Sequence, residues 1–85
     1  MKVLIIEDEQ LAADKLLKLI RQYDSDIKIL DHLETVEDSI TWFSQNPAPD
    51  LLFLDIHLAD GLSFEIFEEV EVNCPIIFTT AYDQY

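Results

Sequence analysis

The sequence has 85 residues, which is enough for one small domain with a modest core. It contains 18 acidic and 5 basic residues, for a net charge of −13. This charge argues against nucleic-acid binding by the segment and against binding to an anionic membrane surface, because both need a basic face. Apolar residues make up 49% of the chain, so we expect a folded domain rather than a disordered one.

The chain shows no sign of export. Cys74 is its single cysteine, so no disulfide can form within the chain, which fits a reducing compartment. The apolar run near the start is four residues long and ends in acids, unlike a secretory signal. No apolar stretch is long enough to span a membrane. We therefore expect a cytoplasmic protein without membrane contact.

The first three predicted elements are a buried strand, an amphipathic helix and a second strand. Val3–Ile6 is a continuous apolar run, which is typical of a strand covered on both faces. Over residues 10–23 the apolar residues follow a helical spacing, and the side chains expected to face the core are Ala12, Leu16, Leu19, Ile20 and Tyr23. After a polar turn, Ile27–Leu30 predicts a second short strand.

The next two elements are a capped helix and a third strand. Thr35 is predicted to be the N-cap of the helix, because acids occupy the first turn that follows it. The prolines within Asn46–Pro49 end this helix, since proline cannot continue it. Leu51–Leu54 is again apolar throughout and predicts a third buried strand.

The last elements complete an alternating pattern. Asp60 and Gly61 mark a turn, and Ser63 is the predicted N-cap of a third helix that reaches Val70 or Glu71. Residues 76–78 predict a fourth strand. Buried strands that alternate with helices favour an α/β fold with a parallel sheet and right-handed crossovers.

Polar residues follow three of the predicted strands, where the chain leaves the core. Glu7 and Asp8 follow the first strand, Asp55 ends the third and Thr80 ends the fourth. Because reactive groups gather at the carboxyl ends of parallel strands, the three acids would share one site if the first and third strands are neighbours. Crowded carboxylates repel each other, so the site predicts Mg²⁺ as the compensating cofactor. Asp55 would then be a carboxylate nucleophile for a phosphoryl group, with a threonine hydroxyl opposite it.

Each of these residues also has a simpler interpretation. A single acid after a strand is usually a solvated loop residue or a helix cap, and Glu7 and Asp8 could favour the N-terminus of the following helix. Thr80 alone could be a turn residue. The predicted site therefore depends on the three strand ends lying together.

The pattern resembles the receiver domain of two-component response regulators. The matching segments are residues 3–9, 49–56 and 75–81. The resemblance implies a flavodoxin-like, doubly wound parallel sheet with the strand order 2-1-3-4. Residues 56–61 and 78–85 are most similar to receivers attached to LytTR-type DNA-binding domains.

The resemblance also implies roles for the site residues. Glu7 and Asp8 would position Mg²⁺. Asp55 would be both the phosphoacceptor and a metal ligand, and the backbone carbonyl of His57 would be the remaining protein ligand. Thr80 would be the switch hydroxyl, with Thr79 as the competing candidate. In this interpretation a sensor histidine kinase phosphorylates Asp55, and the chain is a switch rather than an enzyme with a separate substrate.

The sequence departs from the family in several places. Ala59 and Ser63 stand where the family often has proline and glycine. Nothing after Tyr85 corresponds to the family's fifth strand, its lysine or its last two helices, so residues 1–85 resemble a truncated receiver. The fourth strand would then be an exposed edge through which two copies could pair as a homodimer. A C-terminal DNA-binding domain outside these residues would supply the transcriptional output.

Two alternative functions stay open at this point. A degenerate receiver would act only as a protein-interaction module, without phosphoryl chemistry. A haloacid-dehalogenase-like phosphatase also uses an aspartate after an apolar strand, but it needs a second aspartate two residues later, where this chain has His57.

Overall fold

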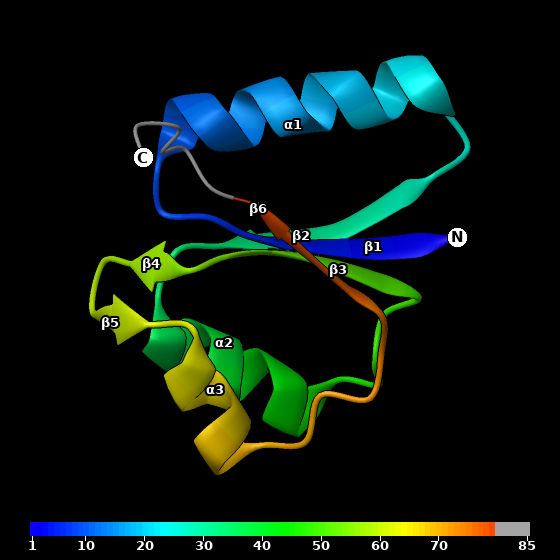
Figure 1. Cartoon of the computed structure of the whole chain (residues 1–85). Coiled ribbons are helices and arrows are strands. Elements are labelled where there is room, and N and C mark those ends of the chain that lie inside the picture. The colour runs from blue at the N-terminus through cyan, green and yellow to red at the C-terminus, as the bar shows by residue number, and fades with distance from the viewer. Residues whose placement is uncertain (80–85) are drawn as a thin grey trace.

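The protein is built around a parallel sheet with helices on both faces, and the computed structural model describes residues 1–79 (Figure 1). The sheet strands are β1 (Lys2–Ile6), β2 (Lys28–Leu33), β3 (Leu51–Asp55) and β6 (Ile76–Thr79). The helices are α1 (Gln10–Tyr23), α2 (Val36–Gln45) and α3 (Phe64–Glu69). Two short strands, β4 (His57–Leu58) and β5 (Gly61–Leu62), form an antiparallel hairpin after β3.

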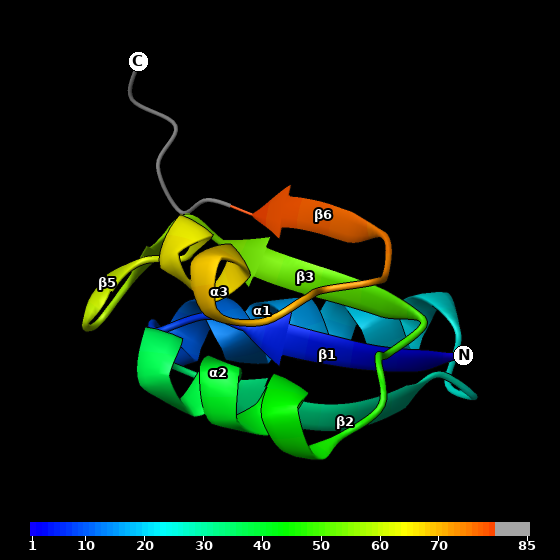
Figure 2. The same ribbon diagram turned by 90° about the horizontal axis from the view of Figure 1, so that it is seen from below.

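The sheet has the order β2-β1-β3-β6, with parallel pairing throughout. Because β6 is the fourth strand of this sheet along the chain, the predicted order 2-1-3-4 and the doubly wound α/β fold are confirmed. Helix α1 covers one face of the sheet, and α2 and α3 cover the other (Figure 1, Figure 2). None of the helices in residues 1–79 has both the length and the apolar character needed to cross a membrane.

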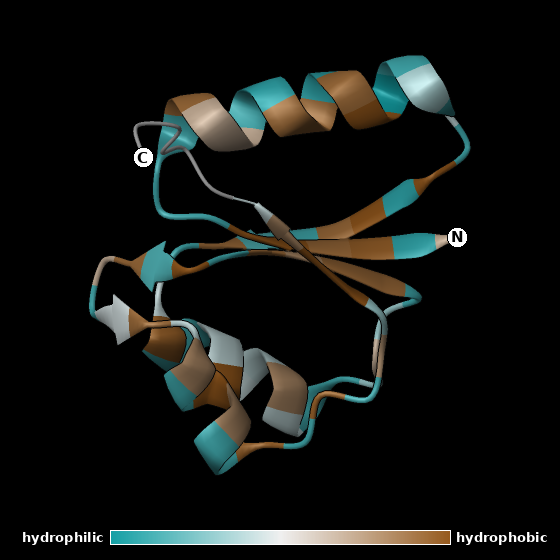
Figure 3. Ribbon diagram, in the orientation of Figure 1, coloured by the Kyte–Doolittle hydropathy of each residue, from teal (hydrophilic) through white to brown (hydrophobic). Residues whose placement is uncertain are grey.

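The core consists of two apolar layers, one on each side of the sheet. On the α1 side, Val3 and Ile5 of β1 pack with Ile20. The layer under α2 and α3 is larger and contains Leu4, Ile6, Val36, Leu52, Leu54, Leu58 and Ile66. Strands β1 and β3 are mostly brown in Figure 3, because nearly all of their residues are apolar, and such strands suit the centre of the sheet, where both faces are covered. Each fully buried aliphatic side chain contributes about 1.5–3 kcal/mol.

Strand β2 is longer than the sequence predicts. Its last three residues, Asp31–Leu33, are not an apolar run, but their backbone pairs with Leu4–Ile6 of β1. β2 is the edge strand of the sheet, and an edge strand can carry polar side chains that face water. Hydrophobic patterning alone therefore ended this strand too early.

Helix α1 has the predicted bounds, but its buried face is rotated from the expected one. Ala13 and Ile20 are buried, whereas Leu19 and Tyr23 are 56% and 86% exposed. Ala13 and Ile20 are seven positions apart, or about two helical turns, so the line of contact with the sheet runs along them. The expected burial of Leu19 and Tyr23 was wrong because both project to one side of that line.

The helix starts agree only in part with the predicted caps. Thr35 caps α2 as predicted, since its Oγ1 accepts a hydrogen bond of 3.0 Å from the Asp38 N–H. Ser63 precedes α3 but makes no capping bond, because its backbone is helical rather than extended. Glu65 instead accepts a bond of 2.8 Å from the Leu62 N–H. Helix α3 also ends slightly before the predicted range.

Candidate functional site

Three carboxylates meet at the carboxyl ends of β1 and β3. These strands are adjacent and parallel, so the residues that follow β1 lie beside the end of β3. Glu7, Asp8 and Asp55 each place one carboxylate oxygen within 4.8 Å of the others. Glu7 and Asp55 are only 4% and 6% exposed, whereas Asp8 is half-buried. The structure thus brings together the three acids that the sequence singled out.

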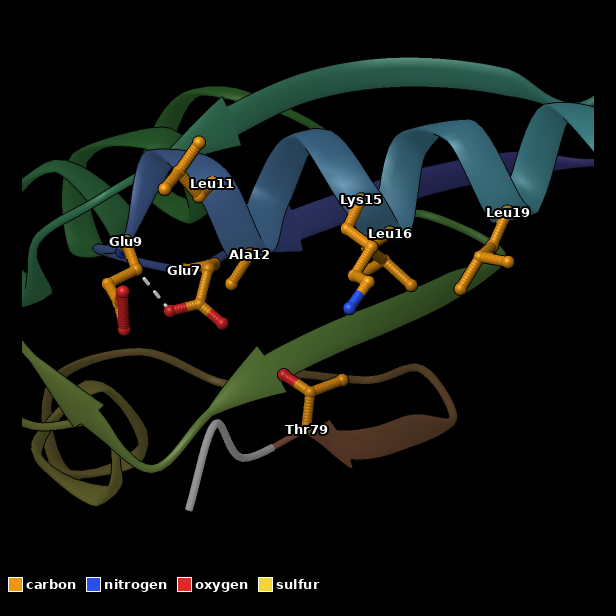
Figure 4. A pocket seen from close by; sticks show the side chains of 8 residues that line it. All are labelled: Glu7, Glu9, Leu11, Ala12, Lys15, Leu16, Leu19 and Thr79. Atoms are coloured by element: carbon orange, nitrogen blue, oxygen red, sulfur yellow. Dashed lines mark hydrogen bonds between the residues drawn. The ribbon is translucent and has the colours of Figure 1, made fainter. Parts of the chain in front are cut away.

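Strand β2 fixes the main chain of Glu7. The Glu7 N–H donates to the Leu33 carbonyl at 2.8 Å, and the His32 Nε2 donates to the Glu7 carbonyl at 2.7 Å. Because a carbonyl oxygen can only accept, His32 Nε2 must be the donor and carries a proton. The Glu7 carboxylate accepts a longer bond of 3.2 Å from the Glu9 N–H (Figure 4). Both backbone polar groups of Glu7 are therefore held by the neighbouring strand.

Asp55 is the last residue of β3, and the residue after it orients its carboxylate. The Ile56 N–H donates to Asp55 Oδ1 at 2.8 Å. The Ile56 carbonyl in turn accepts a bond of 2.9 Å from the Ser63 N–H, which closes the base of the β4–β5 hairpin. His57 follows as the first residue of β4, and its side chain is exposed.

The crowding of acids changes the protonation of Glu7. Burial raises the pKa of the Glu7 carboxyl from 4.5 to about 7, helped by the hydrogen bonds that the protonated carboxyl can donate to Asp55 and Asp8 and by charge repulsion from Asp55. The Glu9 N–H acts in the opposite direction. Two carboxylates about 4.8 Å apart repel by about 3 kcal/mol at an effective dielectric constant near 20. The cluster therefore holds a proton near neutral pH rather than three full negative charges.

The donor set of this cluster fits Mg²⁺. Carboxylate oxygens are the hard ligands that Mg²⁺ prefers. A bound divalent cation would take the place of the proton on Glu7 in compensating the negative charge of the cluster. The partial exposure of Asp8 leaves one side open to water, which Mg²⁺ keeps in its coordination shell. Glu7, Asp8 and Asp55 are thus the residues that would hold the ion. The contribution of the His57 carbonyl stays a prediction.

A cleft of about 610 Å³ opens beside the acids. It is lined by Glu7, Glu9, Leu11, Ala12, Lys15, Leu16, Leu19 and Thr79 (Figure 4). Thr79 pairs in register with Asp55, and its buried Oγ1 has no hydrogen-bond partner among residues 1–79. Thr80, the predicted switch hydroxyl, lies outside the described residues. The choice between Thr79 and Thr80 therefore stays open.

Sequence reasoning missed two residues that support this region. His32 lies in the part of β2 that hydrophobic patterning did not predict, so nothing in the sequence indicated its hydrogen bond to the Glu7 carbonyl. Asp60 was interpreted only as a turn residue, yet its carboxylate accepts hydrogen bonds from Val36 and Glu37 at the start of α2. Contacts between residues this far apart leave no local pattern in a single sequence.

The chain is similar along its whole length to curated regulatory proteins. It is 39% identical to the sensory transduction protein LytT of Bacillus anthracis, over 88 positions that cover 100% of this chain and 35% of LytT. It is 33% identical to the transcriptional regulatory protein LytR of Staphylococcus aureus (strain N315), with coverage of 100% and 35%. The chain thus spans about a third of the length of these relatives. No family model matches it.

Solved receiver structures share the fold. The N-terminal domain of a response regulator/sensory box/GGDEF protein from Carboxydothermus hydrogenoformans is 26% identical, with a TM-score of 0.75 over 100% of this chain and 68% of that one. The HemR receiver domain from Leptospira biflexa is 26% identical, with a TM-score of 0.73 over 94% and 64%. The MaeR response regulator bound to beryllium trifluoride is 20% identical, with a TM-score of 0.75 over 99% and 70%.

The sheet order and these similarities define the class of the protein. The fold is that of a receiver domain, and the chain is similar along its whole length to response regulators. The relatives that match its whole length include LytT and LytR proteins.

Proposed function

We propose that this chain is a phosphorylation-dependent switch in which Asp55 accepts a phosphoryl group with Mg²⁺ as cofactor. The observation that carries the proposal is the cluster of three carboxylate oxygens within 4.8 Å of one another. One acid at a strand end needs no function, but acids that are buried together raise the energy of the folded state. A bound divalent cation would offset that cost and would also attract a negatively charged phosphoryl group to the site.

The proposed chemistry starts from the Asp55 carboxylate. The Ile56 N–H holds Oδ1, so the orientation of the nucleophile is set before the reaction. A carboxylate oxygen attacks the phosphorus of a phosphorylated histidine, and the new O–P bond forms as the P–N bond breaks. The imidazole leaves with the electron pair and takes up a proton. Mg²⁺ held by the three acids would neutralise charge on the phosphoryl oxygens.

The partners and the output also belong to the proposal. A sensor histidine kinase would supply the phosphoryl group in the cytoplasm, and Thr80 would be the switch hydroxyl. The similarity to LytT and LytR supports transcription as the output, through a DNA-binding segment. The charge of −13 favours an output that does not require DNA contact by these 85 residues.

A phosphorylation assay tests the proposal. The protein is incubated with a small-molecule phosphodonor such as acetyl phosphate, with and without Mg²⁺, and its intact mass is measured. We expect the mass gain of one phosphoryl group only with Mg²⁺, and none in Asp55→Asn. Phosphate transfer that persists in Asp55→Asn, or no transfer to the wild type, would contradict the proposal. Thr79→Ala and Thr80→Ala, compared side by side, identify the hydroxyl that affects the lifetime of the phosphorylated form.

A further inference from the structure

A single side chain ties the loop after Asp55 to the start of helix α2. Asp60 lies in the turn of the β4–β5 hairpin (Figure 1). Its Oδ1 accepts a hydrogen bond of 2.6 Å from the Val36 N–H, and its Oδ2 accepts one of 3.1 Å from the Glu37 N–H. The partners are 24 and 23 positions apart in the sequence, so this is a tertiary contact. Both carboxylate oxygens of Asp60 are thus committed to another element of the fold.

Helix α2 already has its own cap. Thr35 Oγ1 accepts the Asp38 N–H at 3.0 Å, and the Thr35 carbonyl accepts the Ser39 N–H at 3.1 Å. The two N–H groups left over in the first turn, those of Val36 and Glu37, are both taken by the Asp60 carboxylate, which belongs to a different element. What Asp60 adds beyond capping is therefore a connection between the helix and the hairpin.

The hairpin transmits this connection to the phosphoacceptor. Its base is closed by the bond from Ser63 to Ile56, and its middle is held by Leu58, which is only 7% exposed and packs in the larger core layer. At the tip, the Ala59 N–H donates a long hydrogen bond of 3.5 Å to the Glu34 carbonyl, and the Asp60 carboxylate accepts the two shorter bonds from the start of α2. The hairpin lies at the same end of the sheet as the carboxyl ends of β1 and β3 (Figure 2). It also carries His57, whose carbonyl is a predicted metal ligand.

We infer that Asp60 is a positioning residue, which fixes the hairpin after Asp55 and couples the phosphoacceptor site to the start of helix α2. This inference rests on the proposed function. Because coupling is reciprocal, a change at Asp55 that moves the hairpin must also act on the N–H groups of Val36 and Glu37. The competing interpretation is a plain helix cap, which would stabilise the protein without affecting the site.

The test compares two caps of the same helix, of which only one belongs to the hairpin. Asp60→Ala removes the connection, whereas Thr35→Ala removes the local cap and leaves the hairpin untouched. Beryllofluoride with Mg²⁺ serves as the probe of the site, and amide NMR spectra report both its affinity and the environment of each N–H. Thermal unfolding measures how much stability each variant has lost.

In the wild type we expect the probe to shift the Val36 and Glu37 amides. Asp60→Ala should lose these shifts and bind the probe about three- to tenfold more weakly. This loss of affinity is at or below the lower end of the roughly 10- to 100-fold loss that is usual when a residue orienting a metal ligand is removed. Thr35→Ala should lose thermal stability but keep both the shifts and the wild-type affinity. Asp60→Asn keeps one acceptor oxygen and should recover part of the affinity.

The outcomes distinguish a failure of the proposed function from a failure of the role inferred for Asp60. A wild type that does not respond to the probe overturns the proposed function, and this inference with it. A responsive wild type with an equally responsive Asp60→Ala overturns the inference alone, as does an equal loss of affinity in Thr35→Ala. If Asp60→Ala does not fold, Asp60→Asn decides the question, because wild-type affinity and shifts in that variant would refute the inference.

Discussion

The affinity of the site for Mg²⁺ should depend on pH through Glu7. Because burial and Asp55 raise the pKa of Glu7 to about 7, the ion must displace a proton at neutral pH. With that pKa, the deprotonated fraction of Glu7 rises from about one in eleven near pH 6 to about ten in eleven near pH 8. The apparent affinity for Mg²⁺ should therefore rise about tenfold over this range.

The assay is a Mg²⁺ titration at constant ionic strength, followed through the Ile56 amide, which donates to Asp55. Glu7→Gln keeps the shape of the side chain but cannot titrate, so its affinity should be lower near pH 8 and nearly independent of pH. Asp8→Asn serves as a second control, which should weaken binding but retain the slope. A wild-type affinity that is flat between about pH 6 and pH 8 would refute the reasoning, since it would mean that no proton competes with the ion.

The same proton affects stability when Mg²⁺ is absent. The pKa of Glu7 is raised above its ordinary value of 4.5, so the folded state binds the proton more tightly than the unfolded state does. The resulting stability is full below about pH 4.5 and is lost as the pH rises through about 7. Denaturant unfolding in a chelating buffer should show this decline, and saturating Mg²⁺ should offset it.

Four further predictions concern single sites. Near pH 8, where Glu7 is largely ionised, Asp55→Asn should stabilise the metal-free protein by about 1–3 kcal/mol in urea unfolding, because it removes charge repulsion, and should reduce the stabilisation by Mg²⁺; a destabilised variant would contradict this. Leu54→Ala, at a fully buried position, should cost about 2–5 kcal/mol in the same assay. Gly61→Ala should cost more than about 1 kcal/mol, because φ is +154° and the new Cβ would lie 2.5 Å from Glu65 Oε2; a neutral result would mean that the turn relaxes. Desolvation acts to raise the pKa of the Asp60 carboxyl, but the hydrogen bonds it accepts from backbone N–H groups outweigh this and lower the pKa. The stability that these bonds contribute should therefore be lost as the pH falls below about 4. Asp60→Asn should show no such loss in acid.

Local patterns were sufficient to predict the strands and the acids at their ends, whereas the strand order that brings the acids together came from the resemblance to receiver domains. The apolar runs Val3–Ile6 and Leu51–Leu54 read as strands buried on both faces, which places them in the middle of a parallel sheet. Neighbouring central strands bring their carboxyl ends together, so the meeting of Glu7, Asp8 and Asp55 follows from the strand order. Few other arrangements of four such strands satisfy the right-handed crossover rule.

The features that could not be predicted depend on tertiary contacts. The extension of β2 through Asp31–Leu33 is decided by backbone pairing with β1 rather than by side-chain hydrophobicity. Ser63 has the composition of a cap, but the preceding hairpin places it in helical geometry and buries it. The contact of Asp60 with α2 joins segments whose spacing in the sequence carries no periodic signal.

The complete burial of β1 has a consequence for the choice of strand register. Val3–Ile6 are all aliphatic and at most 1% exposed, so a shift of this strand along its neighbours would exchange one aliphatic side chain for another at little cost. The residues that forbid the shift are those at its ends. Sliding the strand by one position would move the already buried Glu7 carboxyl between β2 and β3 and away from Asp55, where a polar group without partners is costly. Glu7 thus weakens the folded state through charge repulsion but also favours one register of β1 against β2 and β3.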